Sequence, residues 1–100
     1  MKKTTFIKRL NKAVEDKVIT KNSSAYKLIN GWIIQRHDNA LPYIRPCWTS
    51  GYGRYKTNLD YTHDVERVLQ HMKIKFVSGN DAPKGGKVGN FIKITHKVLN

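Results

Sequence analysis

The sequence has little of what marks a secreted, cysteine-bridged or membrane-spanning protein. Its 100 residues include one cysteine, Cys47, which excludes an intrachain disulfide and a cysteine metal cluster. A chain without disulfides is typical of a reducing compartment, so we expect the cytoplasm. No run of about 18 apolar residues is present, so we expect no transmembrane span. Lys8, Arg9 and Lys12 interrupt the apolar stretch that a signal peptide needs.

Acidic residues are also scarce. The sequence has 7 Asp and Glu against 19 Lys and Arg, which gives a formal net charge of +12. Self-repulsion at this level opposes folding, and an anionic partner relieves it. The cations occur at both ends of the chain and in a central segment, rather than in one basic tail. We therefore expect a nucleic acid as the partner, RNA more than DNA, ahead of an acidic protein or a membrane.

Signatures of catalysis and of cofactor binding are missing as well. The sequence contains no Gly-x-Ser-x-Gly motif, no zinc-ligand spacing and no EF-hand loop. The glycine-rich stretch 79–89 is not a Walker A loop, because no Ser or Thr follows its Gly-Lys and a strand rather than a helix is expected next. We expect no cofactor and no metal, and the protein is predicted to be non-enzymatic.

Hydrophobic spacing predicts two helices. Apolar residues recur at 3.6-residue spacing over residues 5–18, which we interpret as the first helix. They are Phe6, Ile7, Leu10, Ala13, Val14 and Val18. The second helix is expected to begin at Thr62, with Val65, Val68, Leu69 and Met72 on its apolar face.

Other segments have the alternation or composition of strands. Residues 90–98 alternate well and are expected to pair with a strand that begins at residues 74–77, in a hairpin around the loop 79–89. Residues 41–48 contain two prolines, which cannot donate to a ladder, so this strand is expected at a sheet edge. Residues 49–60 lack a clear period and are interpreted as a loop or a frayed strand.

Residues 25–36 are rich in strand-forming side chains and allow two interpretations. Asn30-Gly31 is the strongest local signal for a two-residue hairpin turn. Alternatively, one strand runs to Arg36 and the chain reverses at 37–40. With either choice the order is α-β-β-(β)-α-β-β, which predicts one α+β domain over residues 1–100, with two helices packed on an antiparallel sheet. Because an edge strand can pair with a second copy of the chain, a homodimer is also possible.

A segment with aromatic and basic residues is the first candidate for nucleic-acid binding. Its candidate residues are Arg45, Tyr52, Arg54, Tyr55 and Lys56. Aromatic faces stack on unpaired bases, and cations neutralise phosphates. In the alternative interpretation, Tyr43 and Trp48 belong to the core and the rest is an ordinary loop.

Two further basic segments are candidates. In the loop 79–89, backbone amides without side chains can surround a phosphate, with Lys84 and Lys87 adding charge. The alternative is a long hairpin loop in which Asn80 or Asp81 bonds to local amides. On the first helix, Lys8, Arg9 and Lys12 are candidate phosphate contacts, although Lys12 is also placed to pair with Asp16 at i+4.

Histidines provide the only basis for a catalytic alternative. His63, Arg67 and His71 are expected along one stripe of the second helix. Such residues, or His96, serve a ribonuclease when imidazoles transfer protons and Arg stabilises the charged phosphate. A solvated helix face explains the same stripe.

In style the chain resembles the small, Lys- and Asn-rich early proteins of large lytic tailed phages. The features that carry the resemblance are the short basic domain, the start Met1-Lys2-Lys3 and the last ten residues, 91–100. The resemblance implies an inhibitor of a host defence or toxin–antitoxin system, acting in the host cytoplasm with bound RNA. We therefore expect an RNA-binding accessory protein, with a protein-directed inhibitor and a small ribonuclease toxin as the alternatives.

Overall fold

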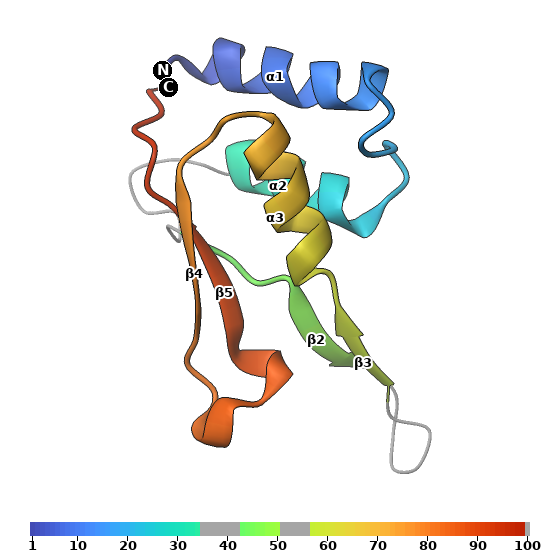
Figure 1. Cartoon of the computed structure of the whole chain (residues 1–100), viewed down its shortest axis with the longest axis vertical. Helices are drawn as coiled ribbons and strands as arrows, with labels where there is room; N and C mark the ends of the chain where they lie inside the picture. Colours follow the sequence, from blue (N-terminus) through green and yellow to red (C-terminus); the bar gives the residue numbers. More distant parts are fainter. Residues whose placement is uncertain (35–42, 51–56, 100) are drawn as a thin grey trace.

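A computed structural model describes residues 1–34, 43–50 and 57–99 and has the α+β architecture expected from the sequence. The helices lie at one end of the molecule, and the strands extend from them toward the other end (Figure 1). The helices are α1 (Lys3–Glu15), α2 (Ser24–Ile34) and α3 (Thr62–His71), and the strands are β1 (Tyr43–Ile44), β2 (Cys47–Ser50), β3 (Thr57–Asp60), β4 (Phe76–Asn80) and β5 (Asn90–Ile94). None of these helices is long and apolar enough to cross a bilayer.

Helix α1 buries the face that its spacing predicts, but it ends three residues earlier than expected. Phe6, Leu10 and Ala13 are buried, because they point toward the other helices and the sheet. Lys17 takes a left-handed backbone conformation (φ 60°). The amides of Lys17 and Val18 donate to the carbonyls of Val14 and Ala13, a pair of bonds that closes the helix end. Val18 still packs against the core, beyond the end of the helix.

The interpretation of residues 25–36 as strands is wrong over the part that the structure describes, because Ser24–Ile34 forms α2. Ala25, Ile29 and Ile33 are buried at a spacing of four, so their packing against α1 and α3 outweighs the strand preference of the segment. Ser23 caps the helix, since its Oγ accepts a hydrogen bond of 3.2 Å from the amide of Tyr26. The expected reversal at 37–40 lies outside the described residues.

The predicted second helix is confirmed as α3. It begins at Thr62, and Val65, Val68 and Leu69 are buried on its apolar face. Met72, immediately after the helix, is buried too. These side chains join the buried residues of α1, α2 and the sheet in one hydrophobic cluster.

The expected hairpin is present as β4 and β5, in a three-stranded antiparallel sheet with the order β1-β5-β4 in which β5 is central. The single edge strand expected over residues 41–48 is divided: Tyr43–Ile44 form β1, which lies at the edge of this sheet and pairs with β5 only, whereas Cys47 begins β2 in another sheet. The register places Ile44, Ile92 and Ser78 on one face of this sheet. The two isoleucines are buried, and Ser78 bonds to Glu66 of α3, so this is the face that the helices cover.

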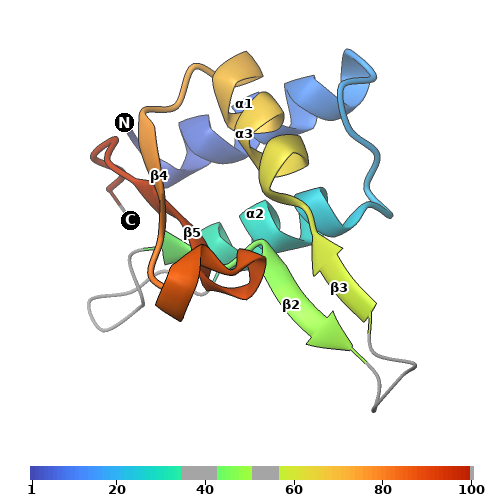
Figure 2. The same cartoon turned by 60° about the horizontal axis from the view of Figure 1, so that its bottom comes forward.

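Strands β2 and β3 form a separate two-stranded ribbon, with Cys47 opposite Asp60 and Trp48 opposite Leu59. The segment 49–60, expected as a loop or frayed strand, therefore contributes to strands at both of its ends. Two short 3-10 turns, Pro83–Gly85 and Lys87–Gly89, connect β4 to β5. This connection lies beside the start of β2 (Figure 2).

The two ends of the described chain lie side by side (Figure 1). Lys2 and Leu99 form an isolated parallel bridge, with the amide of Lys3 donating to the carbonyl of Leu99 at 2.7 Å. The amide of Leu99 donates in turn to the carbonyl of Met1. The first turn of α1 is thereby fastened to the segment that follows β5.

Candidate nucleic-acid interface

The cations predicted on the first helix have three different environments. Lys8 is exposed on α1. Arg9 reaches the end of α3, where its Nη1 donates to the carbonyls of Met72 at 3.1 Å and Lys73 at 3.4 Å. The carbonyls at a helix C-terminus carry partial negative charge, so Arg9 fastens α1 to α3. Of these residues, Lys8 is exposed and makes no ion pair within the described part of the chain.

Lys12 belongs to a small charged cluster. Its ammonium pairs with Asp16 at 3.1 Å, as the spacing predicts, and Asp16 also bonds to the Nε2 of His71 at 2.9 Å. The bond to His71, followed by the bond to Lys12, lowers the pKa of Asp16. An open hollow of about 220 Å³ lies beside them, lined in part by Arg9 and Lys73. The carboxylate reduces the positive charge of this hollow.

Arg45 lies between an acidic residue and two aromatic rings. Its guanidinium forms two bonds to the carboxylate of Asp81, at 2.9 and 2.7 Å, and a third to the carbonyl of Gly89 at 3.2 Å. The bonds to Asp81 raise the pKa of Arg45 above its already high ordinary value. The guanidinium carbon also lies 4.6 Å from the ring centre of Tyr43 and 5.8 Å from that of Phe91. Arg45 therefore has internal partners that its sequence context does not reveal.

The glycine-rich loop uses several of its polar groups internally. Asn80 Oδ1 accepts a bond of 2.9 Å from the amide of Ala82. The amide of Asp81 donates to the carbonyl of Gly89, and the amide of Gly89 donates to Gly86. This is the local bonding that the hairpin-loop alternative predicts. The side chains of Lys84 and Lys87 nevertheless remain exposed at the surface of the loop.

The face of the three-stranded sheet that points away from the helices carries aromatic and basic side chains. The register aligns Tyr43, Lys93 and Val77 across the three strands, and Phe91 lies on the same face two residues before Lys93. Lys75 continues this alternation just before β4. We call these five residues the outer sheet face. Lys93 and Lys75 are exposed, and Val77 is 50% exposed.

The two rings of the outer sheet face contact each other and are set close to the backbone. The ring centres of Tyr43 and Phe91 lie 6.0 Å apart at an interplanar angle of 54°. Gly79 pairs with Phe91, and a Cβ at Gly79 would come within 2.5 Å of the Phe91 ring. The ring therefore lies across the neighbouring strand, in space that only glycine leaves open.

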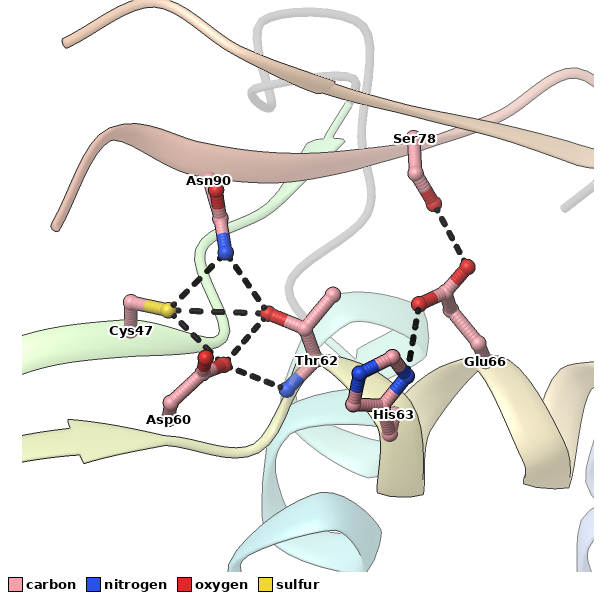
Figure 3. A network of polar contacts seen from close by, with 7 residues as sticks. All are labelled: Cys47, Asp60, Thr62, His63, Glu66, Ser78 and Asn90. Atoms are coloured by element: carbon pink, nitrogen blue, oxygen red, sulfur yellow. Dashed lines mark hydrogen bonds and ion pairs between the residues drawn. The ribbon is translucent and has the colours of Figure 1, made fainter. Parts of the chain in front are cut away.

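A network of polar side chains joins β2, β3, β5 and the start of α3 (Figure 3). Asp60 Oδ1 accepts bonds from the Cys47 thiol at 3.0 Å and from the amide and hydroxyl of Thr62 at 3.0 and 2.6 Å. Asn90 donates to Cys47 Sγ and Thr62 Oγ1. Burial and the bond to Asp60 raise the pKa of the Cys47 thiol. The thiol is thus held protonated, which makes it a structural donor and not a nucleophile.

The histidine stripe of α3 does not bring two imidazoles together. His63 and His71 are separated by eight residues, about 12 Å along a helix. His63 faces Glu66 at 3.8 Å, whereas His71 bonds to Asp16. His96 lies elsewhere, and burial lowers its pKa. Among the described residues, no group of three or more His, Cys, Asp and Glu is placed to hold a metal ion.

Some candidate residues lie outside the described part of the chain, and some surface residues were not candidates. Tyr52, Arg54, Tyr55 and Lys56 belong to the first group. Phe91 belongs to the second, although the alternation of residues 90–98 places it on the same side as Lys93. An aromatic residue on the lysine-bearing side of an amphipathic strand was the available signal.

Comparisons with family models, curated proteins and solved structures found no match.

Proposed function

We propose that this chain is a non-enzymatic nucleic-acid-binding accessory protein, with RNA favoured over DNA. The observation that carries the proposal is the shortage of internal partners for its positive charge. Of the Lys and Arg side chains in the part of the chain that the structure describes, only those of Lys12, Arg45 and Arg67 form ion pairs with carboxylates. The described residues include 16 of the 19 Lys and Arg of the sequence, so most of their positive charge is left for an external anion.

The placement of the unpaired cations supports a long, flexible polyanion over a small anionic ligand. Lys8 on α1, Lys84 on the loop after β4 and Lys93 on the sheet belong to three different elements, and all three are exposed. A phosphodiester chain can contact several such sites together, and each contact releases counterions. RNA is favoured because unpaired bases are most common in RNA and aromatic surface residues suit them.

The test is the salt dependence of binding, measured by fluorescence anisotropy with a labelled single-stranded RNA of mixed sequence. If roughly four to six phosphates are neutralised, log Kd should rise with log salt concentration with a slope of about 3 to 4. The double variant with Lys8→Gln and Lys84→Gln should have a slope smaller than that of the wild type by about 1.4, since each lost phosphate contact removes about 0.7. A slope near zero, or no binding at low salt, would contradict the proposal.

Two outcomes would favour the alternatives. A protein partner that co-purifies after nuclease treatment, in the absence of RNA binding, would favour the protein-directed inhibitor suggested by the likeness to phage early proteins. Cleavage of the RNA by a purified preparation, lost in His71→Ala, would favour a ribonuclease that uses the His71–Asp16 pair. We expect the RNA to be recovered intact.

A further inference from the structure

We propose that the outer sheet face is a binding site for single-stranded nucleic acid, in which bases stack on Tyr43 and Phe91 and phosphates contact Lys93 and Lys75. This inference rests on the proposed function and specifies the site and the form of nucleic acid. It differs from the sites expected from the sequence, which lie on α1, on the segment 52–56 and on the glycine-rich loop.

The first argument is that this face has no role in the hydrophobic core. Within the described residues, the buried cluster and the side chains packed against it include Ile44, Ile92 and Phe76, which belong to the helix-covered face. Tyr43 and Phe91 are not among them. Both rings are half-buried and lie on the side of the sheet that points away from the helices, where they add nothing to the packing between sheet and helices.

The second argument is that the rings are held in a defined arrangement. The guanidinium of Arg45 lies against both rings and is itself fixed by two bonds to Asp81. Gly79 leaves room for the Phe91 ring. A ring that is already ordered loses little entropy when a base stacks on it, so the arrangement favours binding. We therefore assign Arg45 as a positioning residue.

The third argument is charge complementarity. Lys93 lies next to Tyr43 across the β1–β5 ladder, and Lys75 lies before β4 on the same face. Asp81, at the far end of this face, is neutralised by Arg45. Cations beside aromatic rings match a single strand, whose bases offer stacking faces and whose backbone offers phosphates. A duplex keeps its bases paired and cannot use the rings in this way.

The experiment compares a 12-nucleotide single-stranded RNA with a duplex of the same sequence, by anisotropy at fixed salt. The variant Tyr43→Leu, Phe91→Leu should weaken single-strand binding by about tenfold or more, since stacking on one aromatic residue already accounts for a factor of this size. Duplex binding should change less than twofold. Trp48→Leu, which removes an exposed aromatic residue from β2 outside this sheet, is the matched control and should leave single-strand binding unchanged.

Charge at the site is tested separately. Lys93→Ala should lower the salt slope by about 0.7, whereas Lys21→Ala, an exposed lysine before α2, should not change it. Ultraviolet crosslinking of the wild-type protein to the same RNA should attach bases to the peptides containing Tyr43 or Phe91. This measurement needs no variant, so it decides the question even if the double variant does not fold.

The outcomes separate this inference from the proposed function. Steep salt dependence with unchanged affinity in the folded double variant, or crosslinks confined to other peptides, would overturn the outer sheet face as the site and leave nucleic-acid binding intact. Loss of a nuclease-resistant protein partner in the double variant, without loss of RNA affinity, would assign the face to a protein instead. Absence of RNA binding by the wild type would overturn both proposals.

Discussion

Asp60 shows how one carboxylate holds three segments of the chain together. Its bonds to Cys47 and Thr62, the thiol bond foremost, lower the pKa of Asp60 from 3.8 to about 2. Because the folded-state pKa is the lower one, Asp60 stabilises the fold above the unfolded pKa. That contribution is lost as the pH falls through the folded value near 2.

We expect Asp60→Asn to lower the free energy of unfolding at pH 7 by about 1 kcal/mol, the usual net effect of weakening side-chain hydrogen bonds. The difference from wild type should shrink between pH 4 and pH 2, as the wild-type carboxylate becomes protonated. Urea unfolding followed by circular dichroism at pH 7, 4 and 2 measures this. Asp64→Asn, in the first turn of the same helix, is the control. Its free energy of unfolding should fall below pH 4 as that of the wild type does. Parallel curves for Asp60→Asn and wild type would contradict the assignment.

Gly89 and Gly86 provide a contrast in the loop between β4 and β5. A Cβ at Gly89 would lie 2.2 Å from the backbone nitrogen of Ala82, whereas a Cβ at Gly86 would lie 3.8 Å from the Ala82 methyl group. Gly89→Ala should therefore destabilise the protein by about 2 kcal/mol or more, because backbone must move. Gly86→Ala should cost less than about 0.5 kcal/mol. Equal melting temperatures for the two variants would show that the loop is packed differently.

At the level of elements, α2 is where local preference and packing disagree. Gly31 lies within α2, and a Cβ at this position would meet no atom within 4 Å. Gly31→Ala should raise the free energy of unfolding by about 0.5–1 kcal/mol, because alanine favours the helix. In the hairpin turn expected from the sequence, the same change would be destabilising. Chemical denaturation distinguishes the two signs, and Lys27→Gly, one turn earlier on an exposed site, should lower stability by a similar amount.

The elements that could be predicted are those in which pattern and packing agree. Helix α3 combines a polar start at Thr62 with apolar residues at helical spacing, and β5 alternates cleanly because one of its faces is buried. Helix α2 could not be predicted in the same way, because Asn30-Gly31 and the neighbouring isoleucines favour a hairpin locally. The cap at Ser23 and the four-residue spacing of Ala25, Ile29 and Ile33 were the weaker signals that matched the structure.

The candidate site was predictable in its chemistry more than in its geometry. Net charge indicates a polyanion before any fold is known, and that expectation stays a prediction. The pairing of Arg45 with Asp81 spans 36 residues, so nothing local in the sequence indicates it. Whether Phe91 faces helices or solvent depends on which side of the sheet the helices cover. Only the register of three strands decides that question.

Across the whole molecule, the excess charge should affect stability as well as binding. With a net charge of +12, repulsion between cations destabilises the folded chain at low ionic strength, and salt screens it. We expect the melting temperature to rise by about 5 °C between 20 and 300 mM salt, corresponding to about 1 kcal/mol. A polyanion such as poly(U) should raise it further at low salt. Differential scanning fluorimetry measures both effects, and a melting temperature that falls with salt would contradict this account.

The bridge between Lys2 and Leu99 has a consequence for the order of events during synthesis. The first turn of α1 is fastened only after Leu99, 97 positions after Lys2 in the sequence, has been made. A nascent chain that has not reached Leu99 has the sequence of α1 but not the partner that fastens it. The first turn of α1 should therefore be among the last parts of this domain to become ordered, and a nascent chain stopped before Leu99 should remain sensitive to protease at α1.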